Sequence, residues 1–182
     1  MRPTVSASPA SRGPAAAYAA VVRAPFAMLG VRTDAHAVTG LAYLPRTSAA
    51  RAPSNRIAER AVREIERYLD DAAFEFSVPL APGGTPFQRG VWDAIRAIPL
   101  RESRTYGEIA RSVRSAPRAI GQACGANRVA LIIPCHRVVG SRGALGGFMG
   151  EDGADARAHP AASEAIAIKR WLLTHEGYRF GA

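Results

Sequence analysis

The sequence predicts an α/β protein in two parts, a small N-terminal α/β roll followed by a mainly helical domain with a helix-turn-helix. Three observations predict this class. Short apolar runs broken by turn residues occupy the first part, as in a β-meander. Apolar residues at helical spacing and two helix-start signals dominate the second part. A stretch rich in proline and glycine, residues 79–84, separates the two.

The first part, residues 15–80, is expected to hold a meander, one helix and one further strand. The meander strands are predicted at residues 18–25, 28–33 and 38–44. Ser54 then precedes a run in which Ile57, Ala61, Ile65, Tyr68 and Leu69 recur at helical spacing. Residues 74–78 alternate and are predicted to form a strand. Residues 1–14 are small and polar, lack the apolar segment of a secretion signal, and are predicted to be a disordered tail.

The second part, residues 85–182, opens with clear helix starts. Thr85-Pro86-Phe87-Gln88 is a capping box with proline at the first helical position. A second capping box, Thr105 to Glu108, begins a short helix through Val113. Ser115-Ala116-Pro117 restarts a helix that is expected to run to Cys124 and stop at Gly125. Two short helices joined by a tight turn predict a helix-turn-helix.

The charge of the chain favours a polyanionic partner such as nucleic acid. The 182 residues include 24 lysines and arginines against 15 aspartates and glutamates, and the net charge is +9. Between Arg101 and Arg142 there are eight arginines and only two glutamates. Such a patch would neutralise phosphates and bind in a salt-dependent way. Lys169 is the only lysine.

Other classes are disfavoured by composition. No run is long or apolar enough to cross a bilayer, so no membrane partner is expected. The chain has two cysteines, Cys124 and Cys135, and no secretion signal, which predicts a cytoplasmic protein without a structural disulfide. The two cysteines and His136 lack metal-ligand spacing, so neither a zinc site nor a cofactor is expected.

The stretch Ile132-Ile133-Pro134-Cys135-His136-Arg137-Val138-Val139 carries the strongest chemical signal. It places a thiol beside an imidazole between two apolar runs. A free thiol with a pKa near ~8.5 is mostly protonated at neutral pH, and a neighbouring base raises its thiolate fraction. Cys135 is therefore a candidate nucleophile. Taken alone, the motif fits a small buried hydrophobe about as well.

The predicted second helix, residues 116–125, is unusual for a helix that reads the major groove. It offers alanine and glycine where a repressor presents longer polar side chains to base edges. Small residues such as Ala119 and Gly121 permit close approach to the narrow minor groove. Arg118 is its one long charged side chain and suits entry into a duplex, although a solvated surface arginine is the simpler alternative for this helix alone.

Together these motifs resemble the O6-alkylguanine-DNA alkyltransferases, or methylated-DNA–protein-cysteine methyltransferases. The resemblance covers nearly all of the second part and fits the first part only loosely. It is carried by six motifs in one order: Thr85 to Trp92, Tyr106 to Ala110, Arg118 to Gly121, Asn127, Ile133 to Val138, and Trp171 to Gly177.

The resemblance implies a catalytic set. Cys135 would take the alkyl group from O6 of guanine, and His136 would act on the thiol as a base through a water. Glu176 would orient His136, and Asn127 would brace the helix-turn-helix against the active-site turn. Tyr106 would lie beside the flipped nucleotide.

The resemblance also implies the DNA and substrate contacts. Arg118 would fill the gap left by the flipped base, with Ala119, Gly121, Tyr106 and Arg137 also at the DNA. Pro134, Val138, Phe148 and Met149 would line the pocket, where the carbonyls of Cys135 and Val138 would accept from the guanine amine. The expected partner is double-stranded DNA carrying O6-alkylguanine, bound in the minor groove by a monomer with no obligate protein partner.

The alkylated base lies inside the stack, so this chemistry needs it extruded. Transfer leaves a thioether that nothing in the chain is equipped to remove, so each molecule would act once, with O4-alkylthymine left open as a second substrate. Phe148-Met149 departs from the tyrosine and small residue of many relatives, and residues 151–163 resemble an inserted loop.

Three other functions remain alternatives at the level of sequence. A non-catalytic lesion-recognition protein of the alkyltransferase-like type would lack the acceptor cysteine, and Cys135 argues against it. A helix-turn-helix transcription factor would leave the Cys-His pair unexplained. A cysteine hydrolase is the weakest, because no oxyanion loop is evident.

Overall fold

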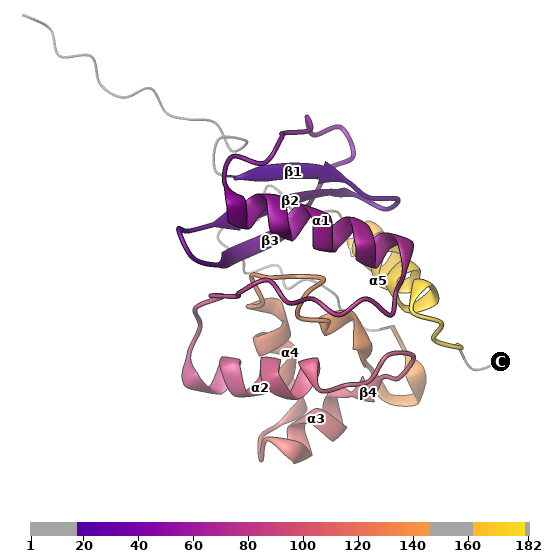
Figure 1. Cartoon of the computed structure of the whole chain (residues 1–182). Coiled ribbons are helices and arrows are strands. Elements are labelled where there is room, and N and C mark those ends of the chain that lie inside the picture. Colours follow the sequence, from indigo (N-terminus) through magenta and orange to yellow (C-terminus); the bar gives the residue numbers. More distant parts are fainter. Residues whose placement is uncertain (1–17, 146–161, 181–182) are drawn as a thin grey trace, which may run out of the picture.

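The computed structural model describes residues 18–145 and 162–180 (Figure 1). Three antiparallel strands form the N-terminal sheet in the order β1-β2-β3. Their bounds are β1 Ala20–Arg23, β2 Met28–Thr33 and β3 Val38–Leu44. The predicted meander is confirmed, with β1 shorter than expected. The predicted tail, Phe148, Met149 and residues 151–161 of the predicted insertion lie outside the described residues.

Helix α1 (Arg56–Asp70) packs across this sheet and buries the face predicted from its spacing, including Ala61, Ile65 and Tyr68. It begins one residue later than the sequence suggests. Asn55, rather than Ser54, is the N-cap, and its side-chain oxygen accepts from the backbone N–H of Ala58 at 2.9 Å.

The strand predicted at residues 74–78 is wrong. The backbone N–H groups of Ser77 and Val78 donate instead to the buried carboxylate of Glu64 on α1, each at 2.8 Å. Phe74 and Phe76 pack edge to face. Alternating residues therefore serve packing here, while a side chain from α1 satisfies the backbone groups that a neighbouring strand would otherwise bond.

The second part begins with the helices α2 (Pro86–Arg96), α3 (Tyr106–Ser112) and α4 (Pro117–Gly125). Both predicted capping boxes are formed, at Thr85 and at Thr105. Helices α3 and α4 make the helix-turn-helix, with Arg114 in the turn at φ 53°. Helix α4 ends one residue later than predicted, because Gly125 is its last residue and Ala126 is the C-cap.

Short elements link the helices to the predicted nucleophile. Strand β4 (Arg104–Thr105) pairs in parallel with β5 (Val138–Val139). Two 3-10 turns, η2 (Cys135–Arg137) and η3 (Ser141–Gly143), flank β5. The last helix, α5 (Ala162–His175), begins within the predicted insertion and lies beside α1 (Figure 1).

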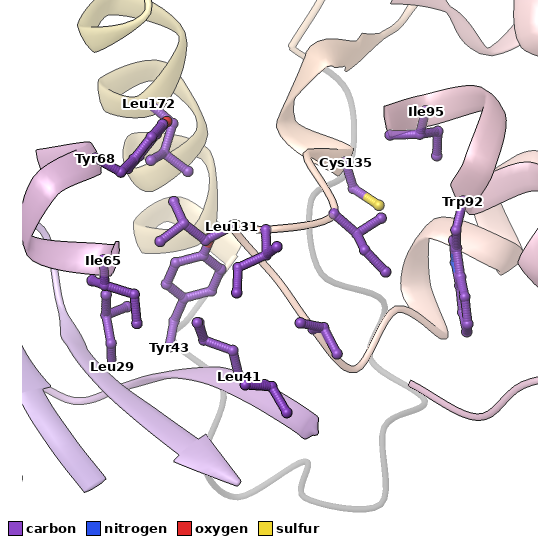
Figure 2. Close-up of a cluster of buried hydrophobic side chains, with 14 of the residues drawn as sticks. Leu29, Leu41, Tyr43, Ile65, Tyr68, Trp92, Ile95, Leu131, Cys135 and Leu172 are labelled. Atoms are coloured by element: carbon purple, nitrogen blue, oxygen red, sulfur yellow. The ribbon is translucent and has the colours of Figure 1, made fainter. Parts of the chain in front are cut away.

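One hydrophobic core runs through both parts (Figure 2). It joins Leu29 and Leu41 of the sheet to Leu131, Trp92 and Cys135. The backbones also meet, because Leu41 N–H donates to the carbonyl of Arg128 at 2.7 Å and Leu41 C=O accepts from Ala130 at 3.2 Å. The segment that leads to Cys135 is therefore paired with an edge of the N-terminal sheet. None of the helices in the described ranges is long and apolar enough to span a membrane.

Candidate active site

Cys135 opens the η2 turn directly after Pro134, with its side chain at the core surface and 9% of the residue exposed. Asn127 holds this turn. Its amide nitrogen donates to the carbonyl of Ile133 at 3.1 Å and to Cys135 Sγ at 3.2 Å. Its amide oxygen accepts from Val129 N–H at 2.9 Å. Asn127, two residues after the end of α4, thus links the helix-turn-helix to the turn that carries the thiol by hydrogen bonds.

His136 and Glu176 form a buried pair behind the thiol. His136 Nε2 lies 2.9 Å from Glu176 Oε1, and both residues are 2% exposed or less. His136 Nδ1 is buried and has no hydrogen-bond partner among the described residues. A buried nitrogen in this position is ready to accept a proton or to bind a water.

Glu176 accepts from two further donors. Arg137 donates from Nε to Oε2 at 2.8 Å and from a terminal nitrogen to Oε1 at 2.9 Å. The hydroxyl of Tyr68 on α1 donates to Oε1 at 2.8 Å. Burial by itself would raise the pKa of Glu176, but the hydrogen bonds from His136 and Arg137 and the charge of Arg137 outweigh burial and hold that pKa well below its ordinary value. Glu176 is therefore a carboxylate at neutral pH.

The charged state of Glu176 decides which nitrogen of His136 carries the proton. A carboxylate is only an acceptor, so Nε2 must donate and Nδ1 of the neutral ring holds the free lone pair. Burial lowers the pKa of His136 more than Glu176 raises it, so the ring is neutral and basic at Nδ1.

The end of α5 brings Glu176 to this place. Gly177 follows Glu176 with φ 75°, a conformation that favours glycine, and its N–H donates to the carbonyl of Thr174. A Cβ at Gly177 would also lie 3.4 Å from Arg101 Nε. The helix can therefore stop at His175, and Glu176 lies in the turn directly after it, next to the histidine.

The pKa of the Cys135 thiol lies below its ordinary value. A contact from the Cys124 thiol is the largest cause, burial opposes it, and the amide of Asn127 and the charge of Lys169 add to the lowering. Lys169 is fully buried on α5, and its Nζ donates to the carbonyl of Val138 at 2.7 Å. Burial lowers the pKa of Lys169 to about 8, so the ammonium is still charged at neutral pH.

The helix-turn-helix presents a surface beside the thiol. Arg118 is exposed at the first turn of α4, and Ala119 and Gly121 are half-buried on the same helix. A Cβ at Gly121 would meet no atom within 4 Å, so this side of α4 is open. Tyr106 is half-buried at the start of α3, and burial first, then the nearby thiols of Cys124 and Cys135, raise its pKa.

Comparison with known proteins identifies the family. Residues 86–178 match the family model described as 6-O-methylguanine DNA methyltransferase, DNA binding domain. This segment is about half of the chain and contains every motif discussed above from α2 to Glu176. The chain belongs to this family.

Curated relatives carry the name methylated-DNA–protein-cysteine methyltransferase. The Methanosarcina acetivorans protein is 41% identical over 64% of this chain and 67% of its own length. The Methanosarcina mazei protein is 35% identical over 72% of this chain and 87% of its own length. The Salmonella typhimurium protein is 44% identical, but the match spans only half of its length.

A solved structure extends the likeness to both parts of the chain. The crystal structure of Mycobacterium tuberculosis OGT in complex with DNA is 34% identical, with a TM-score of 0.70 over 86% of this chain and 90% of that one. This methyltransferase-family chain therefore shares the two-part architecture of a relative whose structure was solved with DNA.

Two groups of this family member that are predicted to contact DNA or substrate already have partners within the protein. Arg137 was expected at the DNA, yet its guanidinium binds Glu176 and the carbonyl of Ile98, and its side chain is 15% exposed. The carbonyl of Val138, expected to accept from guanine, already accepts from Lys169. A carbonyl has two lone pairs, so a guanine amine would share it with the lysine.

Sequence reasoning missed Lys169 and Tyr68, and it interpreted Cys124 only as an apolar position. A signal for Lys169 existed, because the single lysine of an arginine-rich chain lies among Ala165, Ile168 and Leu172 on the apolar face of a helix. Nothing local marked Tyr68, which occupies a core position at helical spacing on α1. Its partner Glu176 is 108 residues away.

Proposed function

We propose that this chain repairs DNA by direct, single-use transfer of an alkyl group from O6 of guanine to Cys135. The observation that carries the proposal is a buried thiol, that of Cys135, which accepts a hydrogen bond from Asn127 and lies next to the His136–Glu176 pair. It supplies a nucleophile of lowered pKa, a base with a free Nδ1 and a carboxylate that fixes the tautomer. A sequence-specific regulator has no use for these groups.

DNA binding would come first. The open face of α4 carries Arg118 beside Ala119 and Gly121, which suits close approach to the minor groove. The alkylated nucleotide would leave the stack for the pocket beside Pro134 and Val138, and Arg118 would occupy the gap. The lesion weakens pairing, which lowers the cost of extrusion and favours damaged guanines over normal ones.

Transfer would then proceed at Cys135. The thiol proton passes to Nδ1 of His136 through a water, which leaves a thiolate stabilised by Asn127, Lys169 and Cys124. The sulfur forms a bond to the alkyl carbon as the carbon–O6 bond breaks, and the electron pair of that bond stays with guanine. The departing guanine takes up, through the water, the proton that Nδ1 of His136 had accepted, so no net proton is gained or lost. Tyr106 lies close enough to the Cys135 thiol to interact with its charge.

Several finer features belong to the same proposal. The product is a thioether, which no described residue is placed to cleave, so one molecule repairs one lesion. We propose that the chain acts as a monomer in the cytoplasm, where its two free cysteines would remain reduced. The helical part from α2 onward would form the catalytic domain, with the sheet and α1 as the N-terminal domain.

The test is the mass of the intact protein after mixing with duplex DNA containing O6-methylguanine. The wild-type chain and Cys124→Ala should each gain one methyl group, and peptide mapping should find it on Cys135. Cys135→Ala should gain none and still bind the duplex, because the phosphate contacts come from arginines. A methyl group on any other residue, or an unmodified wild-type chain that binds DNA, would overturn the assignment in favour of a lesion-recognition or regulatory protein.

A further inference from the structure

A tyrosine from the N-terminal part reaches into the buried hydrogen-bond chain behind the thiol. Tyr68, near the end of α1, is 3% exposed, and its hydroxyl donates to Glu176 Oε1 at 2.8 Å. The same oxygen binds His136 Nε2 at 2.9 Å and a terminal nitrogen of Arg137 at 2.9 Å. Tyr68 and His136 therefore share one acceptor atom.

Tyr68 is held in place by the residue next to Glu176. His175 Nε2 lies 2.8 Å from the backbone carbonyl of Tyr68, and the two rings meet edge to face with centroids 5.3 Å apart. Phe76 packs on the tyrosine ring with centroids 5.4 Å apart. His175 and Glu176 thus bind the backbone carbonyl and the hydroxyl of Tyr68, respectively. These two hydrogen bonds set the position of the end of α5 relative to α1. Figure 2 shows Tyr68 and Leu172 of α5 as members of the same buried cluster.

The hydroxyl stays protonated throughout the working pH range. Burial, followed by the charge of Glu176, raises the pKa of Tyr68 far above its ordinary value. The phenol is thus a permanent donor. Arg137 separately holds both carboxylate oxygens, so loss of the hydroxyl would leave the carboxylate in place but with more negative charge on Oε1.

We propose that Tyr68 is a positioning residue of the transfer reaction, whose hydroxyl competes with His136 for Glu176 Oε1 and so keeps the imidazole neutral and able to take the thiol proton. The proposal rests on the proposed function of Cys135 and His136. If Tyr68 has this role, the N-terminal part contributes to the chemistry as well as to the hydrophobic core.

Other charges also act on His136, and none of them substitutes for this hydroxyl. Glu176 raises its pKa, while Arg137 and Lys169 lower it. Titratable groups from the neighbouring elements complete the surroundings: Tyr43 on β3, Cys124 on α4 and Cys135 on η2. Tyr68 is a neutral donor to Oε1, unlike Arg137, so its removal changes hydrogen bonding without changing formal charge.

The experiment uses the full chain and measures two quantities against pH: the rate of methyl transfer, and the titration of His136 by NMR. Tyr68→Phe should raise the midpoint of the His136 titration by about one unit or less, because one hydrogen bond to a charged acceptor has that order of effect. The acidic limb of the pH–rate profile should move to higher pH by the same amount as the His136 midpoint. Tyr43→Phe is the matched control, since it removes another buried hydroxyl, one that interacts with the backbone of Leu131.

A second variant should shift the two pH midpoints in the opposite direction, and this test does not require that Tyr68→Phe folds. A fluorinated tyrosine incorporated at position 68 is a stronger donor of nearly the same size, so it should lower both midpoints. Wild-type midpoints in both position-68 variants, or an equal shift in Tyr43→Phe, would overturn the proposal. A wild-type chain that takes up no methyl group would instead refute the proposed function, while the His136 titration would still report on Tyr68.

Discussion

At the scale of single residues, the reactivity of Cys135 depends on groups that lie far from it in the sequence. Asn127 donates to the sulfur, the Cys124 thiol contacts it, and Lys169 contributes a buried positive charge. A buried ammonium is costly unless it does something that offsets the loss of hydration. Lys169 binds the carbonyl of Val138 and supports the thiolate, which explains why a lysine is kept inside this core.

Lys169→Met should lower the transfer rate at neutral pH by about tenfold, because a pKa change of one unit alters the thiolate fraction by that factor. The pKa of Lys169 is about 8, so its charge assists the thiol below pH 8 and is lost above it. The deficit of the variant should therefore shrink as pH rises past 8. Alkylation of Cys135 by iodoacetamide as a function of pH measures this without DNA. Arg170→Met, on the exposed side of α5, should match the wild type, and an equal loss there would contradict the role of Lys169.

At the scale of elements, the helix-turn-helix is built from local signals and placed by distant ones. Thr105 caps α3 through a reciprocal capping box with Glu108, whose carboxylate accepts from Thr105 N–H at 2.6 Å. Helix α4 has no side-chain cap and begins at Pro117. The C-terminal end of α4 is joined to the core by Trp92 of α2, whose indole N–H donates to the carbonyl of Ala123 at 2.8 Å. The exposed side of α4 can therefore carry small side chains, because these side chains are not needed to hold the helix in place.

Gly121→Ala should raise the stability of the free protein by about 0.5 to 1 kcal/mol, because glycine inside a helix is unfavourable and the added Cβ meets no atom. The bulkier Gly121→Leu should weaken duplex binding at least tenfold while transfer from free O6-benzylguanine is unchanged, since the free base needs no groove contact. Thermal melts, duplex titrations and transfer rates measure the three effects.

Gly90 on α2 offers the matched control for Gly121. It is exposed, and a Cβ there also meets no atom within 4 Å. Gly90→Ala and Gly90→Leu should keep wild-type affinity for the duplex. Equal losses of duplex binding at both glycines would show that α4 is not the surface that approaches DNA.

At the scale of the whole molecule, the two parts share a core and a set of hydrogen bonds. Leu41 pairs with the backbone around Val129, and α1 meets α5 through Tyr68 and His175. The buried carboxylate of Glu176 lies at this junction and bonds with residues from α1 and from η2. Its charge is consequently part of what holds the parts together.

Acid should destabilise the fold through Glu176. Its pKa in the folded chain lies below the ordinary value of 4.5, so its contribution to stability is present above pH 4.5 and is lost as pH falls below it. Glu176→Gln should lower the free energy of unfolding at pH 7 and flatten its dependence on pH below 4.5. Denaturant titrations at several pH values measure both. Glu66→Gln, at an exposed position of α1, should retain the wild-type slope, and an unchanged slope in Glu176→Gln would place the acid sensitivity elsewhere.

Several features could be predicted from sequence because their causes are local. A capping box needs residues only three positions apart, so Thr85 and Thr105 marked the starts of α2 and α3 correctly. Short apolar runs bounded by turn residues predicted β2 and β3 to the residue. The motif around Cys135 and His136, read with the other motifs in their order, led to the family.

What only the tertiary structure decided are the contacts between distant residues. Residues 74–78 alternate like a strand, yet Glu64 takes their backbone N–H groups, a competition that no local pattern reveals. Arg137 has the charge of a DNA contact but is held by Glu176, 39 residues away. Tyr68 has the spacing of a core residue on an amphipathic helix, and only the docking of α5 on α1 turns its hydroxyl toward Glu176. Neighbouring residues in the sequence determine local hydrogen bonds. The partners of a buried charge are determined only when separate elements pack together and exclude water.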